Sequence, residues 1–177
     1  ASIKAFVGER GGTGCAASNA AATLKWAVER GDKILFLPDQ HLGRNTAYAM
    51  GIPLDQMVVW DPNEIFGGLD PDEVKTARMI LWKGHCSVHT RFSARQIEAV
   101  RKQHPGIRVI VHPEVPWDVV QAADTDAVRL QYLLSGMPGT HRLVGAGSAD
   151  GVGSVTTGPD MIEMAAQDQL PDLAPTL

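Results

Sequence analysis

Two short segments carry side chains that could do chemistry together, Gly-His-Cys-Ser-Val-His at 84–89 and His-Pro-Glu at 112–114. In the first, Gly84 allows a tight turn, and the Cys86 thiolate could be a metal or cluster ligand or a nucleophile paired with an imidazole. His89 could donate a hydrogen bond or shuttle protons. A buried and inert thiol is the alternative for Cys86, because free cysteine is among the most buried residue types.

The His-Pro-Glu segment places an imidazole and a carboxylate two residues apart. Pro113 biases His112 toward extended geometry, so His112 and Glu114 can both reach one cleft. The pair could act as an acid and a base or bind a polar substrate. The alternative is a solvated strand end in which Glu114 caps a helix.

Other segments have less specific patterns. Ser18-Asn19 could cap a helix, or the helix N-terminus could hold a phosphate or carboxylate. Asp-Gln-His-Leu-Gly at 39–43 could bind substrate or only shape a strand-to-helix turn. In a zinc site, Cys86 and His89 would form one ligand pair, but the chain offers no second pair at typical spacing.

Continuous apolar runs predict the strands that position these segments. Such runs are typical of parallel strands buried on both faces, and they cover residues 34–37, 57–60, 79–82 and 109–111, with an apparent strand at 3–7. Helices are expected at 19–30 with Ser18 as N-cap, from Asp70-Pro71, from a Ser93–Gln96 capping box to Pro105, and at 115–124. The alternation predicts an α/β fold, a parallel sheet flanked by helices in three αβα layers.

This fold would place the potentially reactive side chains where a ligand binds, because ligands bind beyond the carboxyl ends of parallel strands. Four of the six histidines, one of the two cysteines and two carboxylates directly follow the apolar runs. We therefore expect a site on a single edge of the sheet, formed by Asp39, His41, His85, Cys86, His89, His112 and Glu114.

The composition is that of an ordinary globular protein, with 44% hydrophobic and 20% charged residues among 177. A formal charge of −4 gives no electrostatic case for nucleic acid or an anionic membrane as a partner. No apolar run approaches the roughly 20 residues that span a bilayer. We expect a cytoplasmic protein without nucleic-acid or membrane partners.

The two ends of the chain predict its domain organisation. Ala1 leads into the apparent strand at 3–7 without a Met, as if the chain were cut from a longer protein. We expect a central α/β domain at 1–105, part of a second, similar α/β domain at 106–145, and a poorly ordered or atypical tail at 146–177. The tail is rich in small residues and proline, which bury little apolar surface.

Three motifs, in this order and at this spacing, resemble the quinolinate synthase family: Phe-Leu-Pro-Asp-Gln-His-Leu-Gly-Arg-Asn at 36–45, Leu-Trp-Lys-Gly-His-Cys-Ser-Val-His at 81–89 and Val-His-Pro-Glu at 111–114. Ser-Asn-Ala at 18–20 also looks like that family's strand-to-helix turn. The resemblance covers residues 1–124 and corresponds to the middle portion of such an enzyme.

Membership of this family implies three similar α/β domains around a cleft, each contributing one cysteine to a four-iron four-sulfur cluster. It implies a transferase of NAD biosynthesis that condenses iminoaspartate with dihydroxyacetone phosphate to quinolinate. Carried over by position, the cluster ligand is Cys86, the catalytic residues are His89, His112 and Glu114, and the substrate-binding residues are Ser18 and Asn19.

The sequence also departs from the family's pattern. The first domain is absent, and one of the three expected cluster cysteines is present. Ala16-Ala17 replace a Ser/Thr pair, Val115 stands where a cysteine is common, and the residues after Asp124 lack the expected Gly-Ser-Thr turn. We expect an incomplete quinolinate synthase that is inactive alone. The alternatives are a non-catalytic α/β module that binds a small dicarboxylate or phosphate, and a Cys/His thiol or zinc hydrolase.

Overall fold

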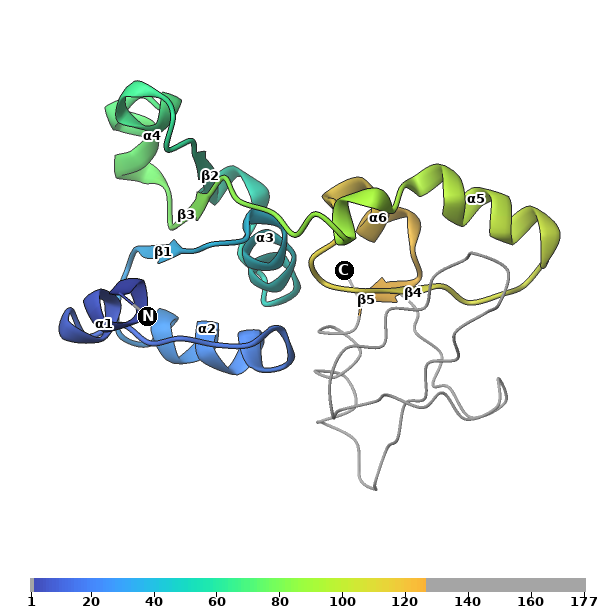
Figure 1. The fold of residues 1–177 in the computed structure, drawn as a ribbon, viewed down its shortest axis with the longest axis horizontal. Helices are drawn as coiled ribbons and strands as arrows, with labels where there is room; N and C mark the ends of the chain where they lie inside the picture. Colours follow the sequence, from blue (N-terminus) through green and yellow to red (C-terminus); the bar gives the residue numbers. More distant parts are fainter. Residues whose placement is uncertain (1, 127–177) are drawn as a thin grey trace, which may run out of the picture. The chain divides into compact units, whose positions relative to one another are not determined.

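The structure, a computed structural model, describes residues 2–126, in which helices alternate with short strands (Figure 1). The helices are α1 (Ser2–Glu9), α2 (Ala20–Val28), α3 (Gln40–Ala49), α4 (Pro71–Thr76), α5 (Ala94–Gln103) and α6 (Trp117–Ala122). The strands are β1 (Ile34–Phe36), β2 (Met57–Trp60), β3 (Met79–Trp82), β4 (Ile110–Val111) and β5 (Thr125–Asp126). Across this described range, no helix has the length and apolar content needed to cross a bilayer.

The first three strands form one parallel sheet in the order β1-β3-β2. Strand β3 is central, since Met79 lies opposite both Ile34 of β1 and Met57 of β2. The carboxyl ends of all three strands therefore lie at one edge of the sheet. This parallel sheet flanked by helices confirms the predicted α/β fold class (Figure 1).

Strands β4 and β5 form a separate two-stranded parallel sheet. The prediction of a single sheet edge is therefore wrong for His112 and Glu114, which follow β4. The reason lies in the backbone partners of the β4 segment. Asp124 N donates to Val109 O (3.0 Å), and Val109 N donates to the Asp124 carboxylate (2.6 Å), which binds this segment to β5.

Each sheet has its own apolar cluster. In the first cluster, α2 and α3 pack on one face of the three-stranded sheet, around Leu24, Met79 and Leu81, which are at most 2% exposed. In the second, Ile97 of α5 packs with Val115 and Val119. The prediction that the strands are buried on both faces is wrong for β1, in which Leu35 is 56% exposed between its two buried neighbours.

The first segment of the chain is a helix and not the expected strand. Residues 3–7 lie inside α1. Ile3, Phe6 and Val7 are spaced three and four residues apart, which places them on one helix face and does not match the two-residue period of a strand. The Arg10 guanidinium stacks on the Phe6 ring at 3.6 Å, one helical turn away.

Local capping signals decide the other helix starts. Asp70 accepts a hydrogen bond from Asp72 N and the Glu73 carboxylate accepts one from Asp70 N, both at 2.8 Å, so α4 starts as predicted. The Ser93–Gln96 capping box of α5 is also confirmed. Ser18 is not the N-cap of α2.

The start of α2 is shifted because Asn19 folds back toward the preceding loop. Its side-chain oxygen accepts a hydrogen bond from Ala16 N at 2.7 Å. This contact closes a 3₁₀ turn at Ala17–Asn19, which contains Ser18, and α2 begins only at Ala20.

The described residues, 2–126, all belong to one compact unit of the chain. The predicted domain boundary between residues 105 and 106 stays a prediction. The predicted boundary after 145 and the tail at 146–177 lie outside the described residues.

Candidate functional site

The site is built where β1 and β3 end side by side. Gly84, two residues beyond β3, forms a parallel bridge with Asp39, and its carbonyl accepts a hydrogen bond from Gln40 N at 3.0 Å. The two chain segments approach so closely that a Cβ on Gly84 would lie 2.1 Å from the Pro38 carbonyl oxygen. Glycine is therefore required at position 84 by this close approach, which carries the chain directly to Cys86.

Asp39 connects the Cys86 loop to helix α3. Its carboxylate is buried, with 7% of the residue exposed. One oxygen caps α3 by accepting from Leu42 N (2.8 Å), and the other accepts from Cys86 N (2.9 Å). Hydrogen bonds to a carboxylate are stronger than those between neutral groups, so Asp39 fixes the backbone of Cys86.

His89 lies between the two other predicted catalytic residues. Its Nδ1 is 2.8 Å from a carboxylate oxygen of Glu114. On one face, its ring stacks on the His112 ring with the centroids 3.9 Å apart and the planes 7° from parallel. The side chain of His89 is 6% exposed and that of Glu114 is 19% exposed. Residues 112–114 thus contact the 84–89 segment, although the two segments follow strands of different sheets.

The surroundings of His112 fix its charge and its tautomer. Burial, reinforced by the neighbouring His89 and opposed by Asp39, lowers the pKa of His112 to about 4. The ring is therefore neutral at pH 7. Its Nδ1 accepts a hydrogen bond from Glu114 N (3.2 Å), so the ring proton is on Nε2. Neutral His112 can donate one hydrogen bond from Nε2.

Three of these residues could hold a metal. The Cys86 sulfur, a ring nitrogen of His89 and a carboxylate oxygen of Glu114 all lie within 4.8 Å of one another. Thiolate, imidazole and carboxylate are ligand types that suit iron and zinc. His89 Nε2 is buried and has no hydrogen-bond partner within residues 2–126. With a free, partly exposed thiol beside it, this group fits a metal, including one corner of an iron–sulfur cluster.

The second cysteine does not share these surroundings. Cys15 packs against the apolar cluster of α2, α3 and the first sheet. Burial raises the pKa of its thiol, which disfavours the thiolate that a metal needs. Between residues 2 and 126, Cys86 is thus the cysteine with metal-binding neighbours.

The structure places the remaining residues of the predicted edge beside this group. His41 and His85 are close enough that His85 contributes to the lowered pKa of His41, for which burial is the largest cause. His41 Nδ1 also lies 3.4 Å from a guanidinium nitrogen of Arg44. No hydrogen bond connects His41 or His85 to His89 or Glu114 in the described part of the chain.

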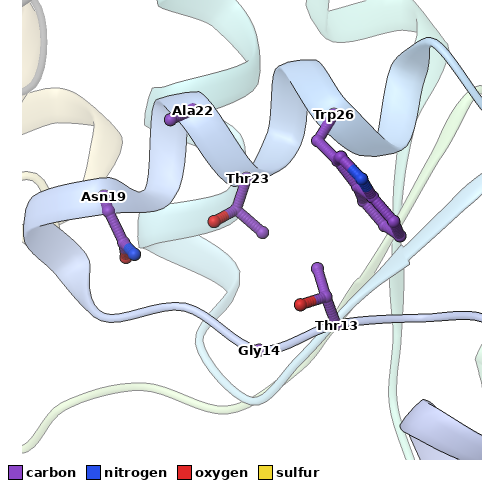
Figure 2. Close-up of a pocket in the computed structure, with 6 residues that line it drawn as sticks. All are labelled: Thr13, Gly14, Asn19, Ala22, Thr23 and Trp26. Carbon is purple, nitrogen blue, oxygen red and sulfur yellow. The ribbon is translucent and has the colours of Figure 1, made fainter.

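The predicted substrate-binding residues lie elsewhere. Asn19 lines an open cavity of about 330 Å³ together with Thr13, Gly14, Ala22, Thr23 and Trp26. Figure 2 shows the Thr23 and Trp26 side chains of α2, and the Asn19 side chain from the turn before it, pointing toward the loop that carries Thr13. Ser18 is in the turn before α2 and does not line this cavity. The cavity contains none of the residues around Cys86, so the structure does not bring the two predicted groups together.

Sequence reasoning missed one residue of the site and the role of another. Asp39 was predicted at this edge, but its bond to Cys86 N spans 47 residues and has no local signal. Asn45, on α3, binds the backbone on both sides of Glu114 across 68 and 70 residues. Both positions follow from the placement of α3, which the apolar pattern did not reveal.

The comparisons with known proteins all indicate the same family. A family model described as "Quinolinate synthetase A protein" matches residues 1–132. A similar protein called quinolinate synthase in Acidobacterium capsulatum is 60% identical over 124 residues, which cover 70% of this chain and 33% of the relative. One in Geobacillus kaustophilus is 53% identical over 150 residues, which cover 82% of this chain and 40% of the relative. One in Corynebacterium glutamicum is 55% identical over 125 residues, which cover 71% of this chain and 32% of the relative. The chain thus spans between 32% and 40% of the length of these relatives. By its sequence over residues 1–132, the chain belongs to the quinolinate synthase family.

Proposed function

We propose that this chain supplies the middle portion of a quinolinate synthase, a cytoplasmic transferase that condenses iminoaspartate with dihydroxyacetone phosphate to quinolinate. The observation that carries the proposal is the meeting of Cys86, His89, His112 and Glu114, which come from two motifs and two sheets. Because the chain spans a minority of its relatives' length, we propose that it is inactive without the remaining domains.

Cys86 would hold one iron of a four-iron four-sulfur cluster, with the other cysteine ligands supplied by other domains. When bound, such a cluster supplies an open iron as a Lewis acid that polarises a substrate carboxylate or hydroxyl. Asp39 contributes by fixing the Cys86 backbone through its 2.9 Å hydrogen bond. The thiol of Cys86 is partly exposed and can reach a ligand.

His89, His112 and Glu114 would bind the substrate and move its protons. The Glu114 carboxylate is 19% exposed and oriented by His89 Nδ1, so it is placed to accept a proton from a carbon or hydroxyl that is losing one. Neutral His112 presents Nε2–H as a donor to a substrate oxygen. His89 Nε2, buried and without a partner within residues 2–126, is a second position for a substrate polar group.

Ser18 and Asn19 remain proposed as substrate-binding residues. Asn19 lines the open cavity of Figure 2, together with the hydroxyl side chains of Thr13 and Thr23. These polar groups and the nearby start of α2 are of the kind that binds a phosphate or carboxylate. Binding here would serve the substrate only if the remaining domains bring this cavity and the Cys86 group to one cleft.

The test is a chimaera in which residues 1–124 of this chain replace the matching segment of the Acidobacterium capsulatum relative, with which the chain is 60% identical over 124 residues. We expect the chimaera to hold a cluster and form quinolinate. Cys86→Ser should lose both, whereas Glu114→Gln should keep the cluster and lose about 100-fold or more in kcat, as expected for a general base. A folded chimaera that holds a cluster but forms no quinolinate would contradict the proposal.

A further inference from the structure

One buried side chain of helix α3, Asn45, contacts the part of the site formed by residues 112–115. The residue is 2% exposed. Its amide nitrogen lies 2.7 Å from the Pro113 carbonyl oxygen and 2.9 Å from the Val115 carbonyl oxygen. Because a carbonyl oxygen can only accept, the NH₂ group must face both partners and donates both of its hydrogens. Asn45 therefore bridges the two carbonyls that flank Glu114.

The other backbone groups around Glu114 are bound within the same turn. Glu114 N donates to His112 Nδ1 and Val115 N donates to the His112 carbonyl, both at 3.2 Å. The turn at 112–115 closes on itself, and Asn45 connects it to α3. The Glu114 carboxylate leaves this turn toward His89 Nδ1 at 2.8 Å.

A comparison within α3 shows that Asn45 does more than fill space. The adjacent Thr46 is fully buried, yet its hydroxyl has no hydrogen-bond partner within residues 2–126. Asn45 uses both N–H groups on the 112–115 turn and leaves its own oxygen without a partner in the same range. Burying an unpaired amide oxygen costs free energy, so the two bonds to the turn are what stabilises an asparagine at this position.

We propose that Asn45 is a positioning residue, which holds the 112–115 turn so that the Glu114 carboxylate meets His89 beside Cys86. Asp39, at the start of the same helix, fixes Cys86, so α3 sets the separation of the thiol and the carboxylate. That this positioning matters for catalysis rests on the proposed function. The geometry itself can be measured on the complete chain without iron or substrate.

The experiment compares Asn45→Asp with Thr46→Val, a matched control that removes the unpartnered hydroxyl of the adjacent buried residue. Aspartate keeps the size of asparagine and replaces both donors with an oxygen that repels the two carbonyls. Two readouts are taken on the ¹⁵N-labelled full chain: the hydrogen-exchange rates of the Glu114 and Val115 amides, and the His89 ring-nitrogen spectrum, which reports the Nδ1 contact with Glu114.

We expect exchange at Glu114 and Val115 to become about tenfold faster in Asn45→Asp, as a weakened hydrogen-bonded turn requires. The His89 Nδ1 signal should lose its downfield, carboxylate-bonded position. Thr46→Val should change neither readout. If Asn45→Asp does not fold, Asn45→Ala decides by the same criteria, because alanine removes both donors without adding a charge.

A folded Asn45 variant with unchanged exchange and an unchanged His89 signal would overturn the proposal and leave Asn45 as a contact between packed elements. The chimaera that tests quinolinate formation is independent of this result. An inactive chimaera would reject the proposed function and leave the Asn45 measurement valid.

Discussion

At the scale of single residues, the surroundings of His112 determine its charge. Its ring is stacked on His89 and its Nδ1 is occupied by Glu114 N. Burial and the adjacent His89 oppose a positive charge there and lower the pKa of His112 to about 4. The low pKa keeps the ring neutral, and the hydrogen bond from Glu114 N fixes its tautomer. The shift in pKa also affects the stability of the chain.

The stability of the folded chain should fall as the pH drops from about 6.5 to about 4. In that window the unfolded chain protonates His112, whose ordinary pKa is 6.5, while the folded chain does not until about 4. The unfolded state thus binds more protons, so acid favours it. We expect a loss of about 2 kcal/mol from this group, after a discount for its partial exposure.

The measurement is the free energy of unfolding in urea at several pH values, for the wild type and His112→Asn. Asparagine presents its oxygen where Nδ1 lies, so it can keep the hydrogen bond from Glu114 N. The variant should show a flatter dependence between these pH values, whereas His104→Asn, at an exposed position, should match the wild type. Equal slopes for His112→Asn and the wild type would rule out a neutral buried His112.

Divalent cobalt should bind at Cys86, His89 and Glu114 in the iron-free chain. Their ligand atoms lie within 4.8 Å of one another, and cobalt accepts the same sulfur, nitrogen and oxygen ligands as zinc. We expect one equivalent to bind, with a near-ultraviolet absorption from charge transfer between thiolate and metal. Cys86→Ser should lose this absorption and Cys15→Ser should keep it. Equal spectra for both variants would show that Cys86, His89 and Glu114 do not bind cobalt as one site.

At the scale of elements, the edge formed by β1 and β3 depends on the absence of a side chain at residue 84. The atom nearest to an added Cβ is the backbone oxygen of Pro38, at 2.1 Å. A backbone oxygen cannot rotate away as the end of a flexible side chain can. The close approach of the two segments also allows the bridge from Gly84 to Asp39, which places Asp39 next to the Cys86 loop.

Gly84→Ala should therefore lower the free energy of unfolding by about 1–3 kcal/mol or more, as overpacking does, and should weaken the Asp39 contact with Cys86 N. Gly8→Ala is the control, because nothing lies within 4 Å of its added Cβ in α1. Alanine is a better helix former than glycine, so this control should raise stability slightly. The two variants are compared by urea denaturation. A Gly84→Ala protein as stable as the control would contradict the close approach.

The local signals of the sequence predicted most elements correctly. The strands of the first sheet and the starts of α4 and α5 depend on contiguous apolar runs or on residues three apart, as in Ser93 and Gln96. The helix at residues 3–7 was missed because a short apolar segment was read as a strand without regard to its spacing. The separation of β4 from the first sheet was missed because strand partners are chosen by long-range contacts.

The candidate site could be predicted in part for the same reason. The residue types of Cys86, His89, His112 and Glu114 indicated chemistry, and the structure brings these four together. Their roles in catalysis and cluster binding stay predictions. The positioning residue Asn45 could not be found, since its two partners lie 68 and 70 residues along the chain.

At the scale of the whole molecule, the chain contains one cysteine with metal-binding neighbours and one packed against a core. The proposed four-iron cluster would need further cysteine ligands from other domains. The hydrogen bonds from Asn45 to Pro113 and Val115 connect the two sheets of residues 2–126, so the Cys86 corner of the site can form without the remaining domains.

Anaerobic reconstitution of this chain should therefore give fewer than four irons per chain, and the product should lose iron on gel filtration. The measurement is iron and sulfide analysis with a visible absorption spectrum, on wild type and Cys86→Ser. A stable four-iron cluster that persists in Cys86→Ser would contradict the proposed role of Cys86. A stable cluster lost in that variant would show that Cys86 is a ligand and that other groups, or a second copy of the chain, complete the ligand set.

The strand order has a consequence for how the chain is made. Strands β1 (Ile34–Phe36) and β2 (Met57–Trp60) do not pair with each other. Both pair only with β3 (Met79–Trp82), which is the last of these three strands to be synthesised. At about 5–20 residues per second on the ribosome, β1 and β2 are exposed for seconds before the sheet can close. During that interval the nascent chain presents two unpaired apolar strands, which are ready targets for chaperones or for aggregation with neighbouring nascent chains.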